Sequence, residues 1–589
     1  MNDATAHLKA EAWTSETRRL LAKALGEFAH ERLLEPEEAE WGYLVQGRRL
    51  TWTFSARRLP LDHWDVDPES VTCLLDEEPQ PLEAGVFFAD FAEALGMSDE
   101  VLQVYLEEVA ATVNRGVWQR SRRQPTAAEL ARADFQTVEA AMTAGHPCFV
   151  AGSGRIGWSV EDYAAYAPEA GEAVPLVWVA LDRTHALFSS TEGTQEETIA
   201  DLAAGDWPWL RERLAALRLS LEDVVVLPVH PWQWRHKIAT GFAAEIAFGR
   251  VRYLGEGTAE HQAQQSIRTF FNRSKPTAPY VKTAMSVLNM GFMRGLSTDY
   301  MAVTPAINDF VAELVHSDDT LRKTGVRVLR EHSAAGYWHP VYTEVAPKGS
   351  PYRKFLAALW RESPVEQTSE GEQLATMASL LHVDGEGNSL AAEHIRRSGQ
   401  APGEWLRSYL DAYLVPLLHC LYKYGLCFMP HGENVILVLD EGRVDRVFMK
   451  DIGEEIGFLN GVTALPEDVG RTAHEVDDWE VPLTILTDVV DCFLRFLSAI
   501  LDREDVLSAE AFWTVVGDVV RDYQAAHPEL EERFERWDLL TETFRLSCLN
   551  RLQLRDNTSM VDLENQSDSL QYAGELDNPL VSRSGAGRS

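Results

Sequence analysis

The spacing of apolar residues changes twice along this chain, and these changes limit its fold more than any other feature. Up to about residue 143, apolar side chains recur mostly at helical intervals, as in 13–34 and in 98–142, where Pro125 is a break. The next 200 residues contain short runs rich in valine, bounded by Gly, Pro and Asp, which is typical of strands. Helical spacing returns beyond Gly403. We therefore expect an α+β protein.

A chain of 589 residues is too long to form a single core, so we expect several packed lobes. The pattern predicts a mainly helical lobe at 1–143, a β-rich lobe at 144–345, a helix-rich lobe at 346–581 and a disordered tail at 582–589. Shorter expected elements are strands at 51–54, 84–88, 148–151, 175–181, 224–229 and 280–287, exposed loops around a short helix at 364–388, and helices at 481–501, 508–525 and 528–549.

The net charge of −37 restricts the partners of the chain. Nucleic acid and anionic membrane would both repel such an acidic surface, so we expect neither as a partner. The six cysteines form no CxxC pair, and the N-terminus lacks the apolar core of a signal peptide. A cytoplasmic, reduced protein is the expectation.

One window breaks this acidity. No Asp or Glu occurs in residues 261–298, which contain five cations: Arg268, Arg273, Lys275, Lys282 and Arg294. Arginine binds phosphate through a planar fork and lysine through a mobile charge, so the window is a candidate triphosphate site. Ser266 and Thr269 offer hydroxyl groups to the same oxygens. Ordinary salt bridges to the acidic remainder explain the charge pattern equally well.

A predicted β-hairpin supplies the complementary anions. Two alternating strands flank a turn at Glu441 and Gly442, between His431-Gly432-Glu433-Asn434 and Lys450-Asp451-Ile452-Gly453. Because a hairpin brings its two ends together, Glu433, Asn434 and Asp451 should converge. Carboxylate and amide oxygens are ligands that suit Mg²⁺. The alternative is that His431 and Asp451 only brace the turn.

Two further motifs are ambiguous. Residues 152–157 spell GSGRIG after an expected strand and before an expected helix at 160–166, which is the context of a dinucleotide-binding turn. Arg155 inside the motif suits a turn over ATP phosphates equally well, and we favour that interpretation. The second motif, HPWQW at 230–234, follows a strand, and we interpret it as a packed corner because tryptophan is usually core material.

Together, these motifs resemble the NRPS-independent siderophore synthetases of the aerobactin-synthetase superfamily. The matching pieces occur in the family's order and span most of the chain: Gly145-His146-Pro147, GRIG at 154–157, VHPWQW at 229–234, QSIRTF at 265–270, YVKTAMSVLNMGFMRG at 280–295, HGEN at 431–434 and KDIG at 450–453. AQQSIRTFFN, MPHGENVILVL and SCLNRLQLRDN are most similar to the desferrioxamine-forming subgroup.

The resemblance implies a cupped hand of thumb, fingers and palm that often forms a homodimer. It also implies ATP-dependent amide formation through an acyl-adenylate. The substrate in this subgroup is an N-hydroxy-N-succinyl diamine, for which we expect cadaverine, oligomerised and closed into a macrocyclic hydroxamate. Citrate or another dicarboxylate as substrate, a Mg²⁺-dependent phosphotransferase and a non-catalytic nucleotide- or dinucleotide-binding protein remain alternatives.

The resemblance also implies a role for individual residues. Arg294 and His431 lie near the α-phosphate and the reacting carboxylate. Many members carry a second His-Pro and a lysine before the GRIG motif, where this chain has CFVAGSG, so Arg155 stands alone as the cation there. Contacts to ATP are implied for Gly154, Arg155, Ser266, Arg268, Thr269, Lys282, Asn434 and Asp451, and contacts to Mg²⁺ for Glu433, Asn434 and Asp451.

Overall fold

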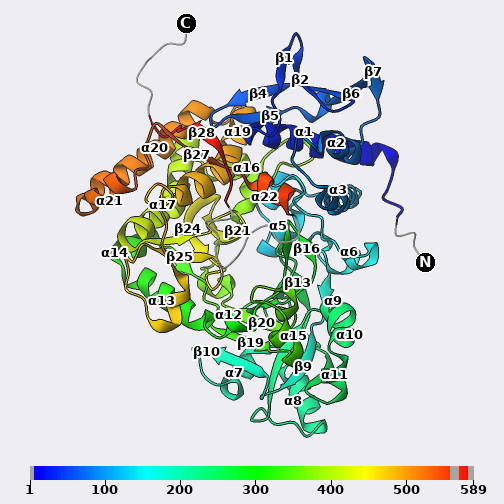
Figure 1. Cartoon of the computed structure of the whole chain (residues 1–589). Coiled ribbons are helices and arrows are strands. Elements are labelled where there is room, and N and C mark those ends of the chain that lie inside the picture. Colours follow the sequence, from blue (N-terminus) through cyan, green and yellow to red (C-terminus); the bar gives the residue numbers. More distant parts are fainter. Residues whose placement is uncertain (1–4, 557–569, 582–589) are drawn as a thin grey trace.

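The computed structural model describes residues 5–556 and 570–581. In Figure 1 the N-terminal helices and strands, in blue, lie at the top, a strand-rich region lies at the bottom, and helices α20 and α21, in orange, lie on the left. The predicted tail at 582–589 lies outside the described residues. In the described part of the chain, no helix is both long and apolar enough to cross a membrane.

The first region combines helices with a sheet that periodicity largely missed. Helix α1 (Ala10–His30), α3 (Asp99–Arg120) and α5 (Phe135–Ala141) fall where helical spacing was found, and α4 (Ala127–Leu130) follows Pro125. The predicted strand at 84–88 is wrong, because these residues begin α2 (Ala84–Phe91), whose Phe87, Phe88 and Phe91 pack into the core. The strands are β1 (Glu37–Ala39), β2 (Gly42–Gln46), β3 (Thr51–Phe54), β6 (Thr72–Leu75) and β7 (Glu78–Gln80) in one sheet, and β4 (Ala56–Leu59) with β5 (His63–Val66) in another.

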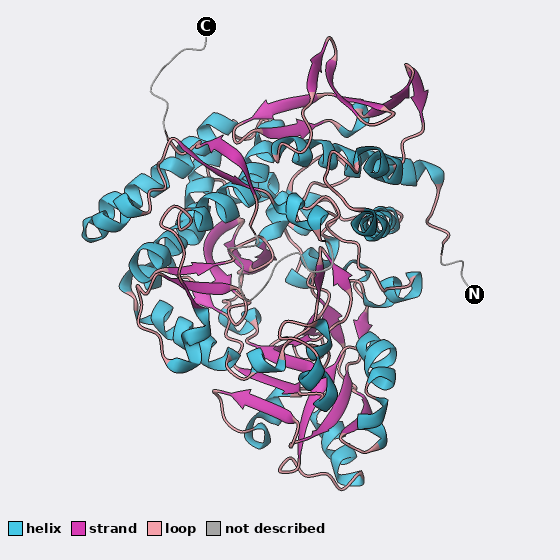
Figure 2. Cartoon of the chain, viewed as in Figure 1, coloured by secondary structure: helices cyan, strands magenta, loops and turns pink. Residues whose placement is uncertain are grey.

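Two sheets share a core in the middle of the chain, where strands crowd the lower part of Figure 2. A three-stranded antiparallel sheet has the order β11-β9-β12 and a seven-stranded sheet has the order β10-β19-β20-β15-β14-β13-β8. Their bounds are β8 (Ala173–Val174), β9 (Val177–Asp182), β10 (Ala186–Ser190), β11 (Val224–Val229), β12 (Val251–Glu256), β13 (His261–Ala263), β14 (Thr269–Asn272), β15 (Tyr280–Thr283), β19 (Ser333–Tyr337) and β20 (Ala357–Arg361).

Side chains along the strands of the seven-stranded sheet alternate between a face in the core and a face toward the candidate site. Phe270, Val281 and Trp360 turn into the core shared by the two sheets. Their neighbours Thr269 and Lys282, which are paired in register, therefore lie on the opposite face of the sheet. Phe271 and Tyr280 on that face pack with Ile436, Val438 and Phe448 of the C-terminal hairpin. The sheet thus presents its polar residues to the C-terminal part of the chain, which contains this hairpin.

The third region contains the predicted hairpin. Strands β23 (Val435–Asp440) and β24 (Arg443–Met449) pair around Glu441 and Gly442, whose φ values of 49° and 87° are those of a two-residue hairpin turn. The hairpin lies in a four-stranded sheet of order β18-β24-β23-β21, with β18 (Arg327–Val328) and β21 (Gln373–Thr376) at its edges. Residues 364–388 are therefore not only exposed loops, because β21 and the buried Met377 and Leu380 lie within them.

Helices surround this sheet. The large C-terminal core includes α13 (Thr304–Ser317), α14 (Asp319–Thr324), α16 (Leu390–Ser398), α17 (Pro402–His419), α18 (Leu483–Ile485), a π-helical segment Leu486–Leu494, α19 (Arg495–Arg503) and α20 (Ala509–Ala526). The predicted helix at 528–549 is only partly correct: α21 (Glu531–Arg536) is followed by β27 (Thr543–Ser547), which pairs with β28 (Tyr572–Asp577). Helix α22 (Leu549–Arg555) then crosses to the first region, where Leu554 joins its core.

The remaining strands and α-helices are smaller. The strands are β16 (Leu288–Asn289) with β17 (Phe292–Met293), and β22 (Leu426–Phe428), β25 (Ile456–Leu459) and β26 (Ala473–His474) in a three-stranded sheet. The helices are α6 (Val160–Tyr166), α7 (Gln195–Leu202), α8 (Trp207–Ala216), α9 (Pro231–Gln233), α10 (Ala239–Gly241), α11 (Ala243–Ala247), α12 (Thr298–Met301) and α15 (Pro340–Val345).

Candidate active site

A buried ion pair joins the basic window to the hairpin. The Lys282 Nζ on β15 lies 2.8 Å from Asp451 Oδ1, just beyond β24, and 3.3 Å from Glu454 Oε2. Burial alone would lower the pKa of Lys282, but Asp451 and Glu454 raise it above its ordinary value. The two segments are 169 residues apart in the chain, and the fold brings them together as the two motifs predict.

Asp451 is held as an anion by several cations. Its backbone has a φ of 62°, and burial alone would raise its pKa. Lys282, Lys450 and Arg361 outweigh burial and hold the pKa of Asp451 well below its usual range. Arg361 Nη1 lies 3.3 Å from the Oδ1 that Lys282 also contacts. Asp451 is therefore a fixed negative charge with three cations around it.

A tight turn places the remaining residues of the first phosphate motif. Ser266 Oγ accepts the backbone N–H of Thr269 at 3.2 Å, and Ile267 between them has a φ of 63°. Arg268 donates to the carbonyl oxygens of Arg294 at 2.9 Å and Gly295 at 2.7 Å, and its Nη2 is 3.9 Å from Glu454. Arg268 thus connects the start of the basic window to its end at Arg294 and Gly295, and it lies close to the acidic residue Glu454.

Arg294 directly follows β17, the second strand of the short hairpin β16–β17. Its Nη2 donates to the carbonyl oxygen of Asn289 at 3.3 Å. In the described part of the chain, its buried Nε has no hydrogen-bond partner. Burial and Arg268 lower the pKa of Arg294, against the charges of Glu433 and Glu455. A half-buried arginine whose Nε donor is buried and unused is suited to an anionic ligand.

The loop before β23 carries the other predicted residues. His431 Nδ1 accepts the N–H of Glu433 at 3.3 Å, and its Nε2 lies 3.7 Å from Glu455 Oε2. Burial alone would lower the pKa of His431, but Glu455 and Glu433 raise it. Asn434 donates to Met429 O at 3.0 Å and to Glu455. The Lys450 N–H donates to Asn434 O at 3.0 Å, so the hairpin ends do meet.

Several residues of this site were not predicted from the sequence. Glu454 and Glu455 directly follow the KDIG motif, so their position was a usable signal. His146 was noted only as part of a motif, yet its ring centroid lies 6.3 Å from that of His431. Glu331 and Arg361 carried no local signal, and burial raises the pKa of Glu331 to about 7.

The GSGRIG motif has a different setting from the one expected. Residues 148–151 form a turn rather than a strand, although α6 begins and ends as predicted, so the strand of a dinucleotide-binding unit is missing. Both terminal nitrogens of Arg155 donate to Glu169 at 2.8 Å, and Arg115 binds the same buried carboxylate. Arg155 would have to leave this carboxylate to reach a phosphate.

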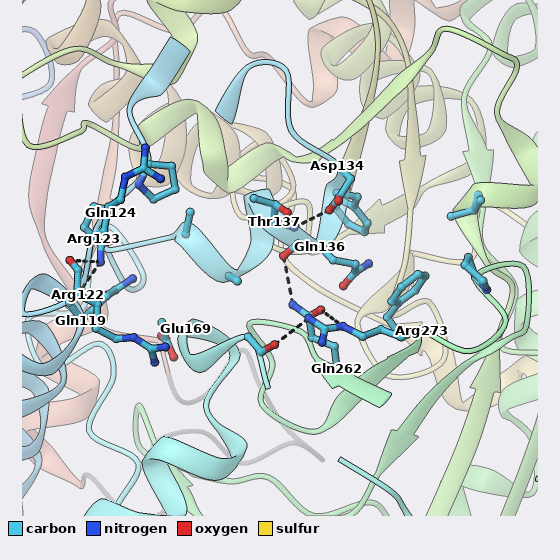
Figure 3. A pocket seen from close by; sticks show the side chains of 18 residues that line it. Gln119, Arg122, Arg123, Gln124, Asp134, Gln136, Thr137, Glu169, Gln262 and Arg273 are labelled. Atoms are coloured by element: carbon cyan, nitrogen blue, oxygen red, sulfur yellow. Dashed lines mark hydrogen bonds between the residues drawn. The ribbon is translucent and has the colours of Figure 1, made fainter. Parts of the chain in front are cut away.

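Glu169 also lines a separate cavity of about 650 Å³, drawn in Figure 3. Arg122 and Arg123 lie on one side of it and Arg273 on the other, with Gln136 and Gln262 between them. Gln136 Oε1 accepts from Gln264, and Gln265 in turn contacts Glu139 of α5. The predicted site residues are not among those that line this cavity.

Metal binding has limited support from geometry. Within the described ranges 5–556 and 570–581, no group of three or more His, Cys, Asp or Glu side chains is arranged to hold a metal ion. Mg²⁺ commonly uses one or two carboxylates together with phosphate oxygens, which Asp451 and Glu433 with the amide of Asn434 suit. Lys282 and Arg361 both contact Asp451 Oδ1, so a metal ion bound by Asp451 would lie beside these cations.

Comparison with known proteins gives the family. Residues 134–382 match the IucA / IucC family, and residues 403–562 match the family described as ferric iron reductase FhuF-like transporter. Putrebactin synthase of Shewanella sp. (strain MR-4) is 44% identical over 98% of this chain and 92% of that protein. The rhizobactin siderophore biosynthesis protein RhbF of Rhizobium meliloti (strain 1021) is 31% identical over 97% of this chain and 96% of that protein.

A solved structure agrees with this relationship. Aerobactin synthetase IucC from a hypervirulent pathotype of Klebsiella pneumoniae superposes with a TM-score of 0.84 and 26% identity, over 97% of this chain and 98% of that one. At this coverage, the shared architecture extends to all three regions described above. The chain therefore belongs to the NRPS-independent siderophore synthetases of the aerobactin-synthetase superfamily.

Proposed function

We propose that this siderophore synthetase activates a substrate carboxylate with ATP as an acyl-adenylate and then joins it to an amine. The observation that carries the proposal is the meeting of Lys282, Arg268 and Arg294 with the acidic hairpin end at Asp451. Attack of a carboxylate on a phosphate requires two anions to approach, and fixed cations in a buried site lower that barrier.

The nucleotide would lie along the basic window. Ser266, Arg268, Thr269 and Lys282 would bind the triphosphate, with Gly154 and Arg155 nearby only if Arg155 leaves Glu169. Glu433, Asn434 and Asp451 would hold Mg²⁺, which neutralises phosphate charge when bound. Asp451 and Lys282 contact one another directly, so their pairing would hold a metal-binding carboxylate beside a triphosphate-binding cation.

The reaction has two steps. In the first, the carboxylate oxygen bonds to the α-phosphorus of ATP and pyrophosphate leaves. Arg294, with its unused buried donor, would orient that carboxylate together with His431. In the second, a neutral amine attacks the acyl carbon, loses a proton and displaces AMP. Amide formation then needs no nucleophilic serine or cysteine.

The proposed substrate is an N-hydroxy-N-succinyl diamine, with cadaverine or putrescine as the diamine. The product would be a hydroxamate oligomer that closes to a macrocycle of the desferrioxamine type. Similarity to putrebactin synthase over nearly the whole chain supports a diamine-derived product. We also propose that the enzyme is cytoplasmic and acts as a homodimer. Citrate as substrate and a phosphotransferase that uses the same Mg²⁺ ligands remain the alternatives.

The nucleotide product separates these reactions. Chromatography of reactions with ATP, Mg²⁺ and N-hydroxy-N-succinylcadaverine should show AMP and pyrophosphate in equal amounts. The putrescine homologue and citrate, tested in parallel, identify the preferred carboxylate. Formation of ADP would favour phosphoryl transfer, and AMP formation with citrate alone would reassign the substrate.

A further inference from the structure

A buried glutamate of α3 contacts the hairpin that carries Arg294. Glu108 is fully buried. Its Oε1 accepts the backbone N–H of Met290 at 2.9 Å, and its Oε2 accepts from Gln553 Nε2 on α22 at 3.3 Å. A Cβ at Gly154 would lie 2.3 Å from Glu108 Cγ, so the glycine leaves room for this side chain. Glu108 thus joins four separate segments of the chain.

One peptide group links Glu108 to Arg294. The N–H of Met290 belongs to the same peptide as the carbonyl oxygen of Asn289. That carbonyl accepts from Arg294 Nη2 at 3.3 Å, while the N–H donates to Glu108. The orientation of this peptide therefore fixes both contacts at once. If it turned over, its carbonyl would point away from the guanidinium.

The peptide lies at a turn that needs outside support. Met290 has a φ of 52° and Gly291 a φ of 71°, and the left-handed region is unfavourable for a residue with a Cβ such as Met290. Burial raises the pKa of Glu108 to about 7, against the charge of Arg294; Tyr105 is the titratable neighbour on α3. Either protonation state keeps an acceptor lone pair for Met290, so the support persists across neutral pH.

We propose that Glu108 is a positioning residue for adenylation. It holds the Asn289–Met290 peptide so that the carbonyl fixes the Arg294 guanidinium for the incoming carboxylate. The assignment rests on the proposed function, because it takes Arg294 to bind that carboxylate. Gln553 holds the second oxygen of Glu108 and contributes from α22.

Steady-state kinetics of pyrophosphate release test the assignment. Glu108→Ala should raise the KM for N-hydroxy-N-succinylcadaverine about tenfold, the size of one lost hydrogen bond to a charged group. The KM for ATP should stay within about twofold, since the triphosphate residues belong to β14, β15 and the turn before β14 rather than to the β16–β17 hairpin. Glu108→Gln keeps the acceptor and should restore a near-native KM. Gln553→Ala should give a smaller rise, and Glu107→Ala, exposed on the same helix, is the matched control.

A second measurement tests the role of Glu108 without relying on enzymatic activity. Hydrogen exchange of the ligand-free protein should be faster in residues 286–294 of Glu108→Ala, but not of Glu108→Gln or Glu107→Ala. An unchanged carboxylate KM in Glu108→Ala, or an equal rise in both KM values, would overturn the positioning role. If the wild type releases no pyrophosphate with any carboxylate, the proposed function fails. Exchange in the hairpin then still decides whether Glu108 holds the peptide.

Discussion

Lys282 and Asp451 are site residues that could be predicted from the sequence. Both were expected at the nucleotide from their motifs, and the structure places them 2.8 Å apart. The acids and cations around them were harder to foresee. Arg361 is 90 residues from Asp451 in the chain, and Glu331 contacts the backbone of Gly453 from 122 residues away. Charge partners at such separations depend on tertiary structure, which local sequence does not encode.

Removal of Lys282 should destabilise the protein through the charge left behind. Lys282→Met leaves buried Asp451 with fewer cations, and breaking such a pair typically costs about 3–5 kcal/mol. Lys282→Met combined with Asp451→Asn should cost less than Lys282→Met alone, because the uncompensated charge is then absent. Urea denaturation measures each value, with exposed Lys323→Met as control. Additive losses in the double variant would contradict the coupling.

Among the elements, local patterns predicted those whose partners are near in sequence. The hairpin β23–β24 has both strands and its turn within a single run of residues, and it formed as expected. The apolar spacing at 528–549 predicts a helix, but residues 543–547 form β27 because they pair with β28, which begins only at Tyr572. The short apolar run Val86-Phe87-Phe88 predicts a strand at 84–88, but such a run also fits a helix that is buried on two sides. Tertiary pairing decided both cases.

The attachment of α22 to α1 should depend on pH. Glu31 accepts from the N–H and Nδ2 of Asn550 at 2.8 Å and from the N–H of Arg551 at 3.1 Å. Burial outweighs these bonds and raises the pKa of Glu31 to about 7. The folded state therefore binds more protons than the unfolded state between pH 4.5 and 7, so this group's contribution to stability falls as pH rises through that range.

Glu31→Gln should flatten this dependence. Between pH 5 and 8, the unfolding free energy of the wild type should fall relative to that of the variant by at most roughly 3 kcal/mol, since one pKa unit corresponds to 1.36 kcal/mol. Urea denaturation of both proteins at several pH values gives the difference between their unfolding free energies. The contributions of other titrating groups cancel in this difference because the two proteins share them. Parallel pH profiles for the two proteins would show that Glu31 does not titrate in this range.

At the scale of the whole molecule, the site exists only where regions meet. The seven-stranded sheet supplies Lys282, the C-terminal hairpin supplies Asp451, and a short hairpin contacted by the first region supplies Arg294. The order of motifs along the chain predicted this family and its α+β architecture. Of the N-terminal sheet, the sequence predicted only the strand at 51–54, which is β3, because strands of three to five residues are too short for a clear periodic signal. The lobe boundaries stay a prediction.

Transfer of oxygen from substrate to nucleotide tests the central claim most directly. The substrate is N-hydroxy-N-succinylcadaverine, or its putrescine homologue, labelled with ¹⁸O in its carboxylate. It is converted with ATP and Mg²⁺, and the masses of the products are measured by mass spectrometry. Adenylation predicts one ¹⁸O atom in AMP and none in pyrophosphate, because the carboxylate oxygen bonds to the α-phosphorus and leaves with it. Label in inorganic phosphate, with ADP as the nucleotide product, would contradict adenylation at the site formed by Lys282, Arg294 and Asp451.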